Sequence, residues 1–368
     1  MEANCPHLGA DMSHADIEEC DTGVIAVSFS DPPPAKVVSI IPEVAAPTIP
    51  REPEPVVPTA NPPKTLMDWA VLILNTPDPI LKVERTRHAV DLFFTGKLPS
   101  VGNKSSNAPK PPDVPLREES FAKNTVDPAK VKSRKNRAVM LHALANIEQW
   151  AIDLAWDIMA RFGPRHPDIP RAFFSDFAKM ALDEAKHFSL LTSRLKAISP
   201  STPYGSMPVH ASLWESATVT SDSFRSRLAI IHLVHEARGL DVNPATIERF
   251  KKAGDTDTVS VLEVIHADEV THVTSGHRWF TWICAQEGRN PVTSFRDEVK
   301  RCWRGDVKGP FNEEARERAG LTQEYYTDLR GEMGLHDPSE GSKVEKVVCS
   351  NSKGLSEGLA DLKIEYVP

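Results

Sequence analysis

Two short segments of this sequence place a glutamate and a histidine three residues apart. Glu184 and His187 lie in "DEAKH", and Glu269 and His272 lie in "DEVTH". In a helix, this spacing puts the carboxylate and the imidazole on one face, about one turn apart. Carboxylate oxygens and imidazole nitrogens are both ligands that iron accepts. The two segments therefore predict a pair of helices that bind metal.

Two single glutamates extend this set. Glu148 in "LHALANIEQWAIDLAW" and Glu236 in "IIHLVHEARGLD" fall on apolar stripes that are expected to face a core. Four buried carboxylates would repel one another strongly without a counter-charge, and two divalent metal ions would supply it. Two iron ions are expected, with manganese or a mixed manganese and iron pair left open. The predicted ligands are Glu148, Glu184, His187, Glu236, Glu269 and His272.

An aspartate precedes each of the paired glutamates. A histidine that binds a metal usually donates its other N–H to a carboxylate, which fixes the orientation of the ring. Asp183 and Asp268 could each reach the histidine of the opposite segment. We therefore expect crossed pairs, Asp183 with His272 and Asp268 with His187.

Four long helical patterns must position these residues. Apolar periodicity and terminator residues predict helices over about 136–162, 171–198, 221–240 and 255–287. The first two and the last two are joined by short connections and should be antiparallel, whereas the segment after residue 198 is long enough for a crossover. A separate short helix, opened by Asn243 and Pro244, is expected between the third and the fourth. The predicted fold is all-α, a four-helix bundle with a long crossover between helices 2 and 3.

The flanking segments differ from the bundle in composition. Residues 1–63 are proline-rich and predict a disordered tail, and 64–98 predict a helical hairpin broken at "NTPDP". In the hairpin, Val83, Val90 and Phe94 are expected on its buried side. The remaining divisions are a linker at 99–135, the bundle at 136–287, a wrap of short helices at 288–337 and a flexible tail at 338–368.

Composition and net charge limit the classes of protein to which the chain could belong. A net charge of −8 argues against a general nucleic-acid-binding surface. The basic stretch 130–137 keeps RNA possible, although a solvated lead-in to the next helix is favoured. The sequence shows no signal peptide and no span of about 18 to 20 apolar residues, so no membrane partner is expected. The five cysteines form no CxxC pair, and a cytoplasmic location is expected.

With its two ExxH segments and two core glutamates, the chain resembles the ferritin-like di-iron carboxylate superfamily. It more closely resembles a ferritin-like family of unknown function, through "HALANIEQWAIDLAWD", "FFSDFAKMALDEAKHFSLL", "PYGSMPVHASLW", "HEARGLDVNP", "DEVTHVTSGHRWF" and "PFNEEAR". It is distantly similar to the di-iron tRNA hydroxylase. The resemblance implies that Glu184 and Glu269 bridge the metals and that Glu148 and Glu236 are terminal ligands. Asn146 stands where such relatives often have a second histidine.

Three functions fit this reading. The expected one is a non-haem di-iron oxidoreductase, an oxygenase or hydroxylase that uses O2, an external electron donor and an unidentified organic substrate. The alternatives are a ferroxidase that handles iron and a helical interaction module without catalysis. No catalytic residue beyond the metal ligands is expected. The oligomeric state is left open, and five further histidines are interpreted as core or surface residues: His142, His232, His235, His266 and His277.

Overall fold

The computed structural model describes residues 4–5, 10–11, 54–118 and 136–334. The chain divides into two compact units, Met1–Met333 and Gly334–Pro368, and the elements below belong to the first. They are mostly helical, which confirms the prediction of an all-α fold. Within the described ranges, no helix is long and apolar enough to cross a membrane.

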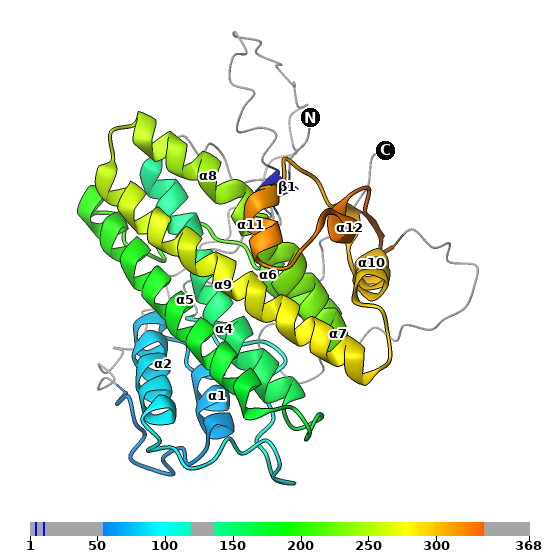
Figure 1. The fold of residues 1–368 in the computed structure, drawn as a ribbon. Helices are drawn as coiled ribbons and strands as arrows, with labels where there is room; N and C mark the ends of the chain where they lie inside the picture. The colour runs from blue at the N-terminus through cyan, green and yellow to red at the C-terminus, as the bar shows by residue number, and fades with distance from the viewer. Residues whose placement is uncertain (1–3, 6–9, 12–53, 119–135, 335–368) are drawn as a thin grey trace, which may run out of the picture. The chain divides into compact units, whose positions relative to one another are not determined.

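Four long helical segments form the centre of the structure (Figure 1). In chain order they are α4 (Arg137–Phe162), α5 (Arg171–Ile198), a run made of α7 (Phe224–Arg227), η3 (Leu228–His235) and α8 (Glu236–Lys252), and α9 (Thr256–Gln286). α5 packs against α4 and α9, and α9 also packs against η3 and α8. The crossover from α5 contains α6 (Ser212–Val219), which packs on α4 and η3.

The third long segment differs from the prediction in two ways. The helix does not stop at Leu240 but continues as α8 through Pro244 to Lys252. Pro244 has no N–H for the carbonyl of Leu240. The side chain of Asn312 donates to that carbonyl instead, at 3.2 Å, so the helix can continue. In addition, the residues before Glu236 form a π-helix, η3, which hydrophobic periodicity did not predict.

The bundle core is apolar and rich in aromatic side chains. Phe173 lies at the centre of a ring cluster, with centroids 4.7 Å from Phe177 and 5.4 Å from Trp279. These rings fill the space between α5 and α9 on one side of the bundle. Further fully buried side chains line the four segments: Leu141, Ile152, Trp156, Phe162, Phe188, Leu228, Leu240 and Phe280.

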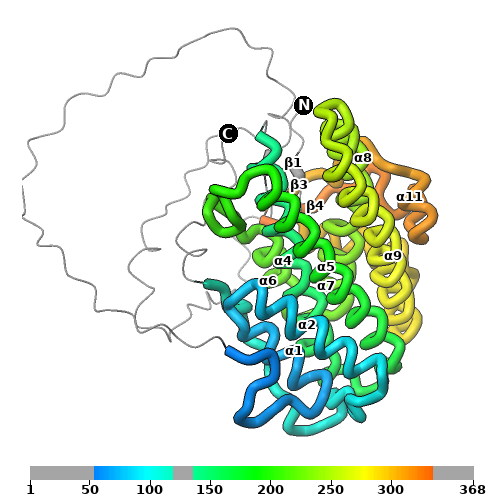
Figure 2. The backbone as a smooth tube through the Cα atoms, turned by 90° about the vertical axis from the view of Figure 1, so that its left-hand side faces the viewer, coloured from blue at the N-terminus to red at the C-terminus, as the bar shows by residue number. Residues whose placement is uncertain are grey.

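A helical hairpin, α1 (Leu66–Leu74) and α2 (Pro79–Phe94), covers α4 and α5 (Figure 2). Thr65 and Asp68 form a capping box at the start of α1, and Asp78 caps α2 by accepting from the N–H of Leu81 at 2.7 Å. Val83 and Val90 are buried as predicted. The expectation for Phe94 is wrong, because its side chain is 52% exposed and its neighbour Phe93 is buried instead.

A buried ion pair joins this hairpin to the bundle. The ammonium of Lys82 on α2 binds the carboxylate of Asp153 on α4, and both side chains are fully buried. Arg117 reaches the other oxygen of Asp153 at 3.4 Å. Burial lowers the pKa of Lys82 and raises that of Asp153, although their mutual attraction acts in the opposite direction.

The chain after α9 forms short elements that cover η3, α8 and α9. They are α10 (Pro291–Cys302), β3 (Arg304–Asp306), α11 (Glu313–Arg318), α12 (Gln323–Tyr326) and β4 (Arg330–Glu332), and β3 pairs antiparallel with β4. A second antiparallel pair joins β1 (Asn4–Cys5) and β2 (Ala10–Asp11).

Parts of the predicted tail and linker lie outside the described residues. From the segment 1–63, the described portion 54–63 contacts the hairpin, where Arg85 binds Glu54 and the carbonyl of Pro55. Residues 99–118 run along α1 and α4. The predicted tail at 338–368 lies entirely outside the described residues, as does most of the basic stretch 130–137. The divisions between domains therefore stay predictions.

The buried pair on the hairpin gives a test of stability. Lys82→Met is expected to lower the free energy of unfolding by about 3 kcal/mol, because Asp153 would keep only Arg117 as a buried counter-charge. Urea denaturation followed by circular dichroism would measure the change. The double variant Lys82→Met with Asp153→Leu should be more stable than the single variant. An unchanged unfolding midpoint in Lys82→Met would contradict the expected role of the pair.

Candidate metal centre

The structure brings the six predicted ligands together between the four helical segments. They form two groups in which one ligand atom from each residue lies within 4.8 Å of the others. Glu148, Glu184, His187 and Glu269 make one group, and Glu184, Glu236, Glu269 and His272 make the other. All six side chains are buried. Glu184 and Glu269 belong to both groups, so the six residues form one continuous cluster that could hold metal.

Polar contacts at both ends of α5 and α9 fix how these helices lie against each other. At one end, Asp255 caps α9 and also accepts from Arg194 on α5 at 2.8 Å. At the other end, Asp176 on α5 accepts from the indole of Trp279 at 2.8 Å and from Arg278 at 3.0 Å. The two ExxH segments are therefore held opposite each other by bonds that lie well away from them.

Both imidazoles point the same ring nitrogen at the carboxylates. His187 Nδ1 lies 3.3 Å from Glu148 Oε2 and 3.3 Å from Glu184 Oε2. His272 Nδ1 lies 3.1 Å from Glu184 Oε1 and 3.8 Å from Glu269 Oε2. In both halves of the centre Nδ1 faces the carboxylates and Nε2 is directed outward, although the nearest carboxylates differ between the two rings.

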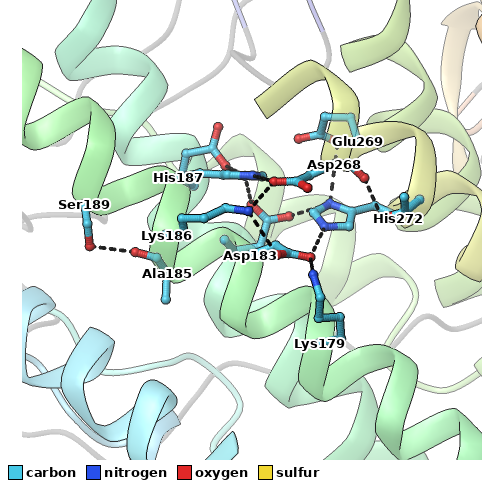
Figure 3. Close-up of polar contacts among 12 residues, drawn as sticks. Lys179, Asp183, Ala185, Lys186, His187, Ser189, Asp268, Glu269 and His272 are labelled. Atoms are coloured by element: carbon cyan, nitrogen blue, oxygen red, sulfur yellow. Dashed lines mark hydrogen bonds and ion pairs between the residues drawn. The ribbon is translucent and has the colours of Figure 1, made fainter. Parts of the chain in front are cut away.

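The outward nitrogens meet the two aspartates in the crossed arrangement (Figure 3). His187 Nε2 donates to Asp268 Oδ2 at 2.9 Å. His272 Nε2 lies 3.5 Å from Asp183 Oδ2, which is long for a hydrogen bond. Neither carboxylate is directed into open solvent, since the Asp183 side chain is 4% exposed and that of Asp268 is 23% exposed. Asp268 can therefore fix the ring of His187, whereas Asp183 lies beside the ring of His272 at ion-pair distance without a hydrogen bond.

Two lysines complete the outer side of this network, and sequence reasoning missed them. Lys186 bridges the two helices, at 2.5 Å from Asp268 and 3.3 Å from Asp183, and Lys179 also binds Asp183. Their spacing from Asp183, four residues before it and three after it, is the usual spacing of ion pairs in helices. This spacing could have predicted ion pairs of the two lysines with Asp183. It is not specific, because exposed lysines at such positions in helices are common.

The four ligand carboxylates have very different proton affinities. Burial, together with the charge of Glu184, raises the pKa of Glu148 to about 8 and that of Glu236 to about 7. Burial and Glu236 raise the pKa of Glu269 well above its usual range. Burial acts on Glu184 in the same direction, but the imidazoles, His272 foremost, more than offset it and hold the pKa well below its usual range. One carboxylate is thus ionised among others that retain protons.

The two imidazoles are cationic in the metal-free protein. Burial alone would lower their pKa values. The hydrogen bond to Asp268 instead raises the pKa of His187 well above its usual range. The charge of Glu184, with Asp183, raises the pKa of His272 to about 9. Protons on the histidines and glutamates therefore compensate the buried negative charge, in the place where metal ions would do so.

The hydrogen bonding of the centre tests whether its residues fit a metal. Among the described residues, Glu184 Oε1, Glu269 Oε2 and His272 Nδ1 are buried atoms that make no hydrogen bond of good geometry, although Glu184 Oε1 and His272 Nδ1 form an ion pair at 3.1 Å. All three are potential metal donors that face the centre. A donor set of oxygen and imidazole nitrogen, with unpaired lone pairs converging, fits iron or manganese.

The five histidines that we interpreted as structural fall into two groups. His142 accepts from the N–H of Gly205 at 2.9 Å, and His277 contacts the hydroxyl of Tyr325 at 3.0 Å, as ordinary packing residues do. Others lie buried or half-buried along η3 and α9: His232, His235 and His266. Asn146 binds the carbonyl of His210 at 3.1 Å, so it takes part in holding the crossover.

The proton affinities predict that metal binding depends on pH. At pH 7, four of the candidate ligands still carry protons that metal ions must displace, so affinity should rise as the pH rises above 7. They are Glu148, Glu269, His187 and His272. Titration calorimetry with Mn²⁺ in buffers of different ionisation enthalpy should show about four protons released per chain at pH 7 when both sites fill. Binding without proton release, or with affinity falling as pH rises, would contradict this account.

Comparison with known proteins places the chain in a family. An uncharacterized protein of Haemophilus influenzae is 34% identical over 216 residues, which is 58% of this chain and 70% of that protein. No solved structure matches the chain. The family model described as "Protein of unknown function (DUF455)" matches residues 75–327, a segment that contains all six clustered residues. Since this match covers more than half of the sequence, the chain belongs to that family of unknown function, DUF455.

Proposed function

We propose that this protein is a non-haem di-iron oxidoreductase of the ferritin-like superfamily, an oxygenase that acts on an organic substrate. The observation that carries the proposal is the pair of overlapping ligand groups that share Glu184 and Glu269. A single metal would need one such group, whereas two groups with two common carboxylates favour a bridged pair of ions. The resemblance to di-iron carboxylate bundles supports the same interpretation.

Each residue has a role in holding the pair. Glu184 and Glu269 would bridge the ions, and Glu148 and Glu236 would each bind one of them. His187 and His272 would bind through Nδ1, and each ring would keep its proton on Nε2, facing Asp268 or Asp183. When bound, an iron pair would supply the redox chemistry by which RH, O2, two protons and two electrons from an external donor yield ROH and water.

The surroundings of the six residues favour chemistry that must exclude water. The neighbouring positions one helical turn away are filled by fully buried apolar side chains, among them Ala145, Ile152, Ala181, Phe188, Leu233 and Val273. A dry, apolar site strengthens electrostatic interactions and protects reactive species from bulk water. Apolar side chains can contact O2 and an apolar part of a substrate. They would not bind the hydrated iron ions that must pass through a ferroxidase.

The added elements favour an oxygenase over an iron-storage protein. α1 and α2 cover α4 and α5, and the elements from α10 to β4 cover the side formed by η3, α8 and α9. Bundles that assemble into closed cages need such faces for contacts between subunits. The ferroxidase alternative uses the same centre, and the electron donor and the cytoplasmic location stay predictions.

The first measurement is metal content. Purified protein loaded with Fe²⁺ without oxygen should hold about two iron ions per chain by elemental analysis. Glu148→Gln should hold less, because a neutral amide replaces a terminal ligand of similar shape. Glu298→Gln is the matched control, since Glu298 is equally buried but binds Ser226 outside the cluster. Wild-type protein without bound metal would rule out the di-iron proposal and favour the interaction module.

The aspartate pairs give a second test. Asp268→Asn should weaken metal binding by about 10-fold to 100-fold. The carboxylate of Asp268 orients the His187 ring, and a neutral amide would hold the Nε2–H of that ring less strongly. Asp176→Asn is the control, since Asp176 also joins α5 to α9 but touches no ligand. Competition with a fluorescent chelator for Co²⁺ would measure both. Equal weakening by the two substitutions would mean that helix packing, not ring orientation, is responsible.

A further inference from the structure

His232 is a buried imidazole without a partner beside the candidate metal centre. Its side chain is 1% exposed, and within the described part of the chain neither Nδ1 nor Nε2 has a hydrogen-bond partner. It lies in the middle of the π-helix η3, four residues before Glu236. The i→i+5 bonds of a π-helix widen the turn, so residues four apart lie nearly one above the other. His232 is therefore about one turn from a predicted ligand and on the same face.

Contacts with α5 and α9 confirm this position. The Cβ of His232 lies against Gly276, where a Cβ on Gly276 would be only 2.6 Å away. Gly276 is one turn beyond His272 on α9. The imidazole ring lies 4.9 Å from the ring of Phe177 on α5, in an edge-to-face arrangement. His232 thus lies in the layer next to the centre, between Gly276, whose lack of a side chain leaves space for it, and the ring of Phe177.

Its electrostatic environment keeps this imidazole neutral. Burial, together with the positive charges of Arg227 and His272, lowers the pKa of His232 to about 3. The ring therefore carries one N–H donor and one acceptor nitrogen at neutral pH. Glu184 attracts the cationic form, but burial outweighs it.

Packing alone does not account for a histidine at this position. Two unpaired polar atoms in an apolar layer cost roughly 1 to 3 kcal/mol each, whereas a leucine would fill a similar volume without that cost. The positions around it, including Leu233 and Val273, are apolar and fully buried or nearly so. A partner from outside the chain would satisfy the ring, and the adjacent metal centre is where such a partner would bind.

We propose that His232 binds the small exogenous ligand of the metal centre, donating a hydrogen bond to its oxygen or terminal anionic atom from the η3 side. The ligand class is dioxygen or a small oxygen-bearing or anionic group of the substrate. This inference rests on the proposed di-metal function but assigns a residue that is not one of the six ligands. His232 does not belong to either ligand group, so its removal should leave the metals in place.

Azide is a suitable probe, because it binds ferric centres through one end and accepts a hydrogen bond. Iron-loaded, oxidised protein would be titrated with azide and followed by its charge-transfer absorption. His232→Leu should keep about two irons per chain but bind azide at least about 10-fold more weakly, the loss expected for one buried hydrogen bond to an anion. His232→Gln, which retains a donor, should recover part of the affinity.

His142→Gln is the matched control, since His142 is equally buried but its Nε2 already accepts from the N–H of Gly205. Its azide affinity should equal that of the wild type. Unchanged azide affinity in His232→Leu, or no azide binding by iron-loaded wild-type protein, would overturn the inference. Loss of iron from both His232→Leu and His232→Gln would also overturn the inference, because it would indicate that His232 binds the metal directly. Wild-type protein without iron would instead overturn the proposed function itself.

Discussion

Repulsion among four carboxylates buried between the helices is the constraint on which the rest of the structure depends. In a medium of low polarity, like charges a few ångströms apart cannot all remain ionised. In the metal-free protein, protons solve the problem, because Glu148 and Glu269 retain theirs while Glu184 is ionised between two cationic imidazoles. The centre can therefore fold before metal enters, and metal ions would replace protons rather than fill a collapsed space.

The same constraint explains the order of charges from the centre to the surface. Glu184 contacts His187, His187 donates to Asp268, and Asp268 binds Lys186, which is 40% exposed. Along this chain of contacts the charges alternate, from the negative Glu184 through the positive His187 and the negative Asp268 to the positive Lys186. This alternation lowers the pKa of Asp268 and raises that of Lys186, so the outer pair stays ionised. The orientation of the ring is thus coupled to an ion pair that water can reach.

Most of the centre could be predicted from the sequence because residue type and helical spacing both restrict it. An ExxH segment on an apolar stripe can place its two polar side chains in only one direction, and the structure brings Glu184 and His187 together with Glu269 and His272. The role of Lys186 could not be predicted in this way, because an exposed lysine meets no such restriction. Phe94 illustrates the same limit in the hairpin, where a shift of one residue exchanges it with Phe93 at the buried face.

The third helix departs most from the prediction, and it does so on both sides of one ligand. Apolar periodicity over eight residues cannot distinguish α from π hydrogen bonding, so η3 has no signature in the sequence, and continuation through Pro244 depends on a distant side chain, Asn312. Glu236 is located at the junction of η3 and α8. Its position is therefore set by irregular backbone and by the C-terminal segment, whereas α4, α5 and α9 hold their ligands on regular helices. An irregular element that carries one candidate ligand, beside the unpaired His232, departs from local helix rules where a functional site is expected.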